Sequence, residues 1–100
     1  MSYFESFLPL LRENGATGIL LEYEETFPFS GNLAEAKHTH AYTMNEVNYF
    51  KKLCKDNNLY IVPLVQTYGH LEWLLKLKKF KHLRDNARYP QVSFHEMNSF

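Results

Sequence analysis

Apolar residues near the N-terminus recur at the spacing of one helix face. The positions i, i+3, i+4 and i+7 are taken by Phe4, Phe7, Leu8 and Leu11. This spacing predicts a helix over residues 2–14, with Gly15 as its C-terminal cap. Because a proline inside a helix loses a hydrogen bond and clashes with the preceding turn, we expect Pro9 to cause a kink or a late helix start.

Two short apolar runs predict strands buried on both faces of a parallel sheet. The first covers residues 19–21, continues into Glu22-Tyr23-Glu24 and ends before Phe27-Pro28. The second covers residues 60–66 and contains Pro63. Proline cannot donate to a strand ladder, so we expect Pro63 at a bulge or at an unpaired position.

A capping box predicts a helix between these two strands. Thr43 can accept from the amide of Glu46 while the Glu46 carboxylate reaches back, and Asn57-Asn58 ends the helix. Residues 28–42 are predicted to form a long loop with one helical turn near Ala34, and residues 71–84 a final helix.

This order of elements predicts the α/β class with parallel strands joined by a helical crossover. Two strands that are both interior are too few for a finished fold, because more strands must lie beside them. The pattern therefore indicates a piece of a larger α/β domain.

Composition bounds the class of protein. The chain has 100 residues, 45% hydrophobic and 22% charged, with a net charge of zero, which is typical of at most one globular domain and excludes a disordered or collagenous chain. No apolar run approaches the roughly 20 residues of a membrane-spanning helix, and the N-terminal residues lack the pattern of a secretory signal. With Cys54 as the single cysteine, neither a disulfide framework nor a structural zinc site is expected. We expect a cytoplasmic protein, with the nucleus as a second compartment, that is neither secreted nor membrane-bound.

Charge is distributed unevenly along the chain. Residues 1–36 hold six acidic residues and one basic one, whereas residues 76–100 hold six basic residues and two acidic ones. A basic end can bind an anionic partner such as nucleic acid. We favour a solvated helix face instead, because the apolar residues of the same stretch need a polar face opposite them.

Polar residues follow each predicted strand at its C-terminal end. Glu22 and Glu24 are spaced by two, so on a strand both carboxylates would point to the same side of the sheet. Paired carboxylates suit general acid–base chemistry. The alternative is that they line a rim and bind basic side chains or loop amides.

The second polar cluster lies where residues 60–66 lead into the last helix. Gly69 allows a tight turn, His70 can donate or accept near neutral pH, and Glu72 lies in the first helical turn, where the dipole favours negative charge. Each of these residues also has an ordinary structural explanation. His38 and His40 fall short of the three or four ligands that zinc uses, so no metal site is expected.

These blocks together resemble glycoside hydrolase family 20, the β-N-acetylhexosaminidases. The resemblance rests on residues 15–24, on Phe27-Pro28 and Ala41-Tyr42, and on residues 62–72, and it extends from about Phe7 to Glu96. It implies a (β/α)8 barrel that removes terminal β-linked N-acetylgalactosamine or N-acetylglucosamine, with a preference for N-acetylgalactosamine in the branch that this chain resembles.

The chemistry that the resemblance implies is substrate-assisted hydrolysis with retention of configuration. The substrate's own acetamido oxygen attacks the anomeric carbon, while an adjacent Asp-Glu pair after the fourth strand orients the acetamido group and protonates the leaving oxygen. This chain contains no Asp-Glu dipeptide. Residues 1–100 would therefore be a partial catalytic barrel with strands two and three, lacking the first strand and everything from the fourth, and the catalytic pair is expected beyond Phe100.

The resemblance also assigns site residues. His70 matches a Gly-His element that supports the catalytic carboxylates and borders the sugar, so Gly69, His70 and Glu72 are carried over, and with them Glu22 and Glu24. Most of the wider family has Asp-x-Pro-Gly-His at this point, whereas this chain has Gln66 and Tyr68 in place of the Asp and Pro. The role of that Asp does not transfer to Gln66.

Two hypotheses follow. In the first, the chain is part of a hexosaminidase that acts on glycans, needs no cofactor and is inactive as the isolated segment. Whether the longer protein forms a homodimer is left open. In the second, the short chain is a binding module that uses its strand edges or its basic helix to contact a partner.

Overall fold

The computed structural model describes residues 1–67, 69–86 and 88–90, and the chain divides into two compact units. Unit 1 consists of Met1–Glu22 and Tyr42–Leu64. Unit 2 consists of Tyr23–Ala41 together with the described residues from Val65 onward. Tyr68, and the end of the resembling stretch at Glu96, lie outside the described residues.

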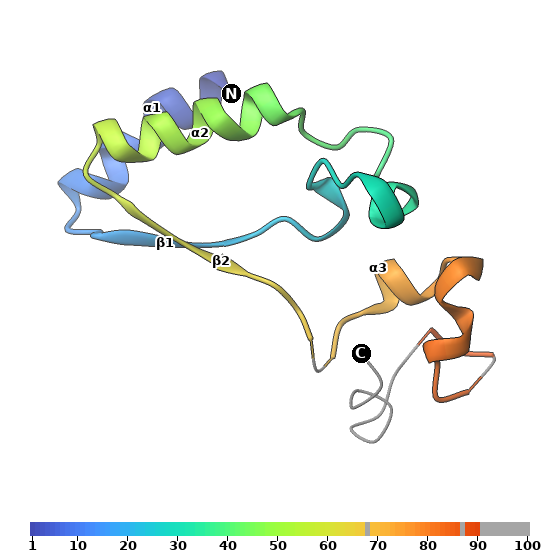
Figure 1. Cartoon of the computed structure of the whole chain (residues 1–100). Coiled ribbons are helices and arrows are strands. Elements are labelled where there is room, and N and C mark those ends of the chain that lie inside the picture. Colours follow the sequence, from blue (N-terminus) through green and yellow to red (C-terminus); the bar gives the residue numbers. More distant parts are fainter. Residues whose placement is uncertain (68, 87, 91–100) are drawn as a thin grey trace. The chain divides into compact units, whose positions relative to one another are not determined.

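Unit 1 is a parallel strand pair with two helices. Strands β1 (Gly18–Glu22) and β2 (Tyr60–Leu64) pair in parallel, with Gly18 opposite Tyr60 and Glu22 opposite Leu64. Helix α2 (Met44–Asp56) connects them, and helix α1 (Ser2–Glu13) precedes β1. Figure 1 shows both helices on the same side of the pair. The predicted mixed α/β class with parallel strands is confirmed.

The core of unit 1 lies between the helices and the covered face of the strands. Leu8 of α1, Phe50 and Cys54 of α2, and Leu59 are buried, and Ile19 and Ile61 of the strands pack against them. The face of α1 that the apolar spacing predicts is thus the face that packs against the core. Burial also raises the pKa of the Cys54 thiol, because a thiolate loses solvation in this core.

Helix α1 begins at Ser2, so the expected late start is wrong, and Pro9 lies within the helix. Pro9 has no N–H to donate to the preceding turn, which costs the helix one hydrogen bond. Packing of Leu8 into the core stabilises the helix despite this loss. The chain leaves α1 as predicted, through Gly15 with φ of 94°.

The capping box at the start of α2 is confirmed. The Glu46 amide donates to Thr43 Oγ1 at 3.2 Å, and the Thr43 amide donates to Glu46 Oε2 at 2.8 Å. At the other end Asn57 caps the helix, and Asn58 adopts the left-handed conformation with φ of 55°. Asparagine tolerates this conformation better than most residues.

The strand pair is covered on one face only. Exposure alternates along β1, and the residues that face away from the helices include Leu20 at 67% exposed and Val62 at 55%. The prediction that both faces are buried is therefore wrong for the described residues. Helices α1 and α2 cover one face, and no other element of unit 1 covers the second.

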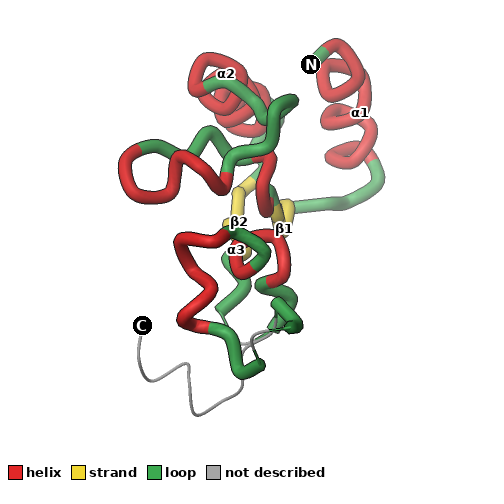
Figure 2. The backbone as a smooth tube through the Cα atoms, turned by 90° about the vertical axis from the view of Figure 1, so that its right-hand side faces the viewer, coloured by secondary structure: helices red, strands yellow, loops and turns green. Residues whose placement is uncertain are grey.

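Unit 2 contains short helical segments. These are the 3-10 helices η1 (Glu24–Thr26), η2 (Gly31–Ala36) and η3 (Lys78–Leu83), and the α-helix α3 (Glu72–Leu75). Helix η2 confirms the expected turn near Ala34. Figure 2 shows the helical segments and the two strands by colour.

The predicted helix over residues 71–84 is wrong. It breaks at Leu77, whose ψ of 138° is extended, into one α-helical turn and a 3-10 helix. The half-buried side chains recur every three residues, at Leu74, Leu77, Phe80 and Leu83. A spacing of three drifts around an α-helix but stays on one face of a 3-10 helix, which has three residues per turn.

Within the described ranges, no helix combines the length and the apolar character that crossing a membrane requires.

Two leucines on α1 test the packing of unit 1. Leu8 is 1% exposed, whereas Leu10 is 52% exposed. We predict that Leu8→Ala lowers the free energy of unfolding by about 2 to 5 kcal/mol, because it leaves a cavity between α1 and α2. Leu10→Ala should change it by less than about 0.5 kcal/mol. Urea unfolding followed by circular dichroism measures both, and equal effects would contradict the assigned core.

Candidate functional site

The two candidate clusters lie where the parallel strands end. Glu22 is the last residue of β1, exposed, and opposite Leu64 at the end of β2. By strand alternation it lies on the same face as Leu20, which is the bare face of the pair. Glu22 belongs to unit 1, whereas Glu24, Gly69, His70 and Glu72 belong to unit 2.

Glu24 does not lie on the strand, so the expected alternation with Glu22 is wrong. The chain turns after Glu22, because the amide and the hydroxyl of Thr26 both donate to the Tyr23 carbonyl, at 2.9 and 2.5 Å. Glu24 opens η1 with a left-handed φ of 47°. The two carboxylates are therefore presented by different elements.

His70 also has a left-handed backbone, with φ of 57°. It directly precedes Leu71, which caps α3 and is buried. We expected Gly69 to provide the tight turn, but the positive φ is at His70, and Gly15 and Gly31 are the glycines with positive φ among the described residues. The unusual conformation is thus adopted by the residue that carries an imidazole.

Glu72 is the first residue of α3 and is exposed. Because α3 has only four residues, its dipole gives Glu72 little of the stabilisation that we expected. His70 and Glu72 flank the buried Leu71, so the anchoring of this leucine fixes the backbone from which both extend.

Left-handed non-glycine residues are uncommon, and they cost about 1 to 3 kcal/mol unless surrounding contacts enforce them. The described residues hold three, Glu24, Asn58 and His70. Two of the three are candidate site residues that follow the two parallel strands. Backbone strain gathers at functional sites, so this observation favours both clusters over ordinary loops.

Sequence reasoning missed the contacts that join residues near Glu24 to residues near Glu72 within unit 2. Lys76 Nζ lies 2.8 Å from Glu25 Oε2 and forms an ion pair. The hydrogen bond from Lys76 lowers the pKa of Glu25 from its usual 4.5. The sequence predicts a solvated face for the basic stretch from residue 76, and it carries no signal that pairs Lys76 with a residue 51 positions away.

Aromatic rings form a continuous series in the same unit. Tyr23 contacts Phe27, Phe27 contacts Phe29, and Phe29 stacks on Trp73 with centroids 5.6 Å apart and planes at 16°. The indole Nε1 of Trp73 is buried and has no acceptor among the described residues. Buried donors are almost always paired in native proteins, so this N–H is an exception among the described residues.

The histidine pair of the loop makes a local contact. The amide of His40 donates to His38 Nδ1 at 3.0 Å. In the part of the chain that the structure describes, no three His, Cys, Asp or Glu side chains gather as a metal site would require.

Comparison with known proteins identifies similar sequences. No family model matches the chain. Bovine hexosaminidase D is 44% identical over 90 residues, which are 90% of this chain and 26% of the bovine protein. Human hexosaminidase D is 40% identical over 100 residues, 99% of this chain and 21% of the human protein. The chain resembles hexosaminidase D. It spans about a quarter or less of the length of these relatives, and the expected hexosaminidase resemblance is confirmed.

The Glu25–Lys76 pair predicts a pH dependence. Because the pKa of Glu25 is lowered in the folded state, the stability from this pair is present above pH 4.5 and is lost as the pH falls through the folded pKa below 4.5. Lys76→Met should return the pKa of Glu25 toward 4.5. Carboxyl-carbon NMR titration of Glu25 measures the change, and an unchanged pKa would show that the pair does not form in solution.

The left-handed residues predict an unusual response to glycine. Replacing His70 or Asn58 by Gly relieves the left-handed backbone, so the free energy of unfolding should stay unchanged or rise by up to about 1 kcal/mol. His70→Val should instead lower it by more than about 1 kcal/mol, because a β-branched residue tolerates positive φ poorly. Urea unfolding of the three variants checks this; a clear loss of stability in His70→Gly would exclude the strained conformation.

Proposed function

We propose that this chain is a segment of a β-N-acetylhexosaminidase and forms part of its sugar site. The similarity to bovine and human hexosaminidase D, over 90% and 99% of this chain, carries this proposal. The placement of the candidate residues supports it, because both clusters follow the C-terminal ends of parallel strands. The proposed protein is a glycosidase whose substrates are glycans or glycoconjugates with a terminal N-acetylhexosamine.

The strand pair has the features of two neighbouring strands of a (β/α)8 barrel. In such a barrel helices cover the outer face of the strands, and side chains from the other strands fill the inside. Unit 1 has this arrangement, with α1 and α2 on one face and Leu20 and Val62 exposed on the other. The bare face would become the barrel interior. Glu22 then lies at the C-terminal rim, where barrel enzymes build their sites.

The proposed mechanism is substrate-assisted hydrolysis with retention of configuration. This chain would contribute the border of the sugar pocket rather than the acid catalyst. In the segment after β2, His70 would donate or accept a hydrogen bond, and Gly69 and Glu72 complete this cluster. Glu22, the last residue of β1, and Glu24, two residues later, would add carboxylates. An Asp-Glu pair contributed by another part of the domain would orient the acetamido group and protonate the leaving oxygen, so we expect the isolated chain to be inactive.

The bare strand face also supports a second function, association of the short chain with a partner. The side chains of Leu20, Val62 and Tyr60 are more than half exposed. They lie on a two-stranded sheet that no further strand extends among the described residues. Apolar strands with open edges favour association. Gel filtration of the isolated chain separates the two functions: a sharp monomer or a defined oligomer supports the binding module, and aggregation supports an incomplete barrel.

A chimera tests the enzymatic proposal. The segment of human hexosaminidase D that aligns with this chain is replaced by residues 1–100, and hydrolysis of a nitrophenyl N-acetyl-β-hexosaminide is measured. We expect the chimera to hydrolyse the substrate and the isolated chain to show no turnover. A folded chimera without activity, or turnover by the isolated chain, would refute the proposal.

Within the chimera, a matched pair of glycine variants tests the role of His70. His70→Gly removes the imidazole from the proposed sugar pocket, so kcat/KM should fall by at least about tenfold. Asn58→Gly changes a residue with the same left-handed backbone between α2 and β2, at the N-terminal rather than the C-terminal end of the strand, and should leave kcat/KM unchanged. Equal kinetics for the two variants would exclude His70 from the site.

A further inference from the structure

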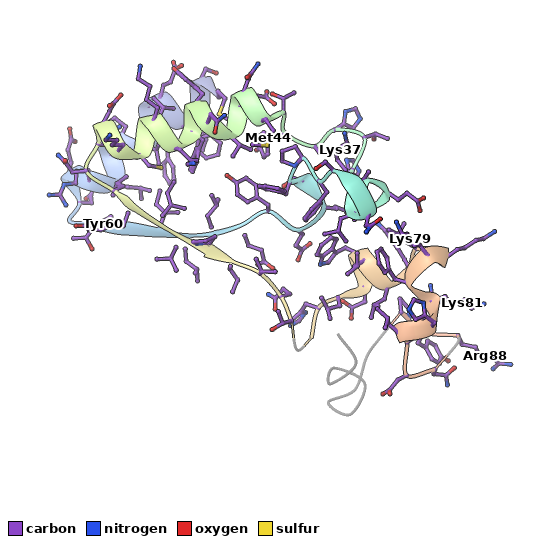
Figure 3. All side chains as sticks on the ribbon, viewed as in Figure 1. Lys37, Met44, Tyr60, Lys79, Lys81 and Arg88 are labelled. Carbon is purple, nitrogen blue, oxygen red and sulfur yellow. The ribbon has the colours of Figure 1, made fainter. Side chains whose placement is uncertain are left out.

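Three contacts in unit 2 join the segment after β1 to the segment after β2. Glu25 Oε2 lies 2.8 Å from Lys76 Nζ, the Phe29 ring stacks on Trp73, and Lys79 Nζ donates to the Asn32 carbonyl at 2.7 Å. The labelled Lys79 side chain can be followed in Figure 3. The contacts combine an ion pair, an aromatic stack and a backbone acceptor, so they constrain the two segments at separate points.

These contacts lie close in the chain to the left-handed residues of the candidate site. Glu25 directly follows Glu24, which has φ of 47°. Trp73 and Lys76 belong to the single turn of α3 and its end, and this turn starts two residues after His70. The ion pair and the stack are therefore only a few residues along the chain from Glu24 and His70.

Glu25 is held at two points. Its carboxylate accepts from Lys76, and its backbone carbonyl accepts from the His38 amide at 2.7 Å. The Glu25 side chain is 29% exposed, less than that of Lys76 at 54%. Exposed ion pairs contribute little to overall stability, so any effect of this pair is expected in the local placement of the two segments.

Helix α3 is anchored on its other side as well. Leu71 and Leu75 are buried, and Arg84 Nε donates to the Leu75 carbonyl at 2.6 Å. The single turn is therefore anchored by two buried side chains and a hydrogen bond. A contact made at Lys76 or Trp73 is transmitted through it to the residues that precede it.

We propose that Glu25 and Lys76, together with the Phe29–Trp73 stack, are positioning residues that set the placement of Glu24 relative to His70. They act through the backbone and do not contact the substrate. This proposal rests on the proposed sugar site. It adds the residues that position the segment after β1 relative to the segment after β2.

Charge reversal tests the coupling in the chain itself. Trp73 is the only tryptophan, so its fluorescence and its quenching by acrylamide report on the stack. We expect Glu25→Lys or Lys76→Glu alone to raise the quenching of Trp73, and the double reversal to restore it. Lys78→Glu is the matched control, because Lys78 is exposed and makes no polar contact with the described residues. Single reversals that act no more strongly than this control would overturn the proposal.

The same reversals in the chimera test the effect on catalysis. A misplaced polar group reduces the enzyme's stabilisation of the transition state more than its binding of the substrate. Each single reversal should therefore lower kcat by about 10- to 100-fold with a smaller change in KM. The double reversal should recover most of the loss. If both single reversals leave kcat unchanged, or if the double reversal does not rescue it, the positioning role is wrong.

The two measurements separate this proposal from the function on which it rests. An inactive chimera whose isolated chain still shows the rescued Trp73 signal would refute the hexosaminidase proposal and leave the coupling of the loops established. An active chimera that is insensitive to the reversals would refute the positioning role alone. If the isolated chain does not fold, the rescue of kcat in the chimera decides the question.

Discussion

The parallel pairing of β1 with β2 is the constraint on which the rest of unit 1 depends. The register places Gly18 opposite Tyr60, and a Cβ on Gly18 would lie 3.2 Å from the Tyr60 carbonyl oxygen. A larger residue would push the strands apart at their first pair. The pairing also requires a crossover, which α2 provides, and α2 then brings Phe50 and Cys54 onto Leu8 of α1. The core thus follows from the pairing of two short strands.

One-sided burial of this pair connects the fold with the proposed function. A sheet with helices on one face and bare apolar residues on the other is incomplete by itself, because the bare face keeps its apolar area in water. A barrel strand has this same division between a helix side and an interior side. The one-sided burial therefore supports the proposed barrel segment, as does the similarity to about a quarter or less of hexosaminidase D.

Unit 2 contains four of the five candidate site residues, and long-range contacts join its short helical segments. Short 3-10 turns and one α-helical turn cannot fix side chains by themselves. In our proposal the ion pair, the aromatic stack and the buried leucines of α3 do so, close in the chain to Glu24 and His70, which adopt left-handed conformations. Such conformations persist only where the surroundings enforce them.

The sequence by itself determined the local elements of unit 1 and the place of the candidate clusters. The apolar spacing of α1, the capping box at Thr43 and the two apolar runs are local signals, so they predicted α1, α2 and both strands. The hexosaminidase resemblance was also contained in the sequence. Only the tertiary structure decided that Glu24 leaves the strand, that His70 rather than Gly69 is left-handed, and that the last helix breaks at Leu77. Apolar periodicity does not report the positive φ of Glu24 or His70, and it cannot reveal a contact between residues far apart in the chain, such as Glu25 with Lys76.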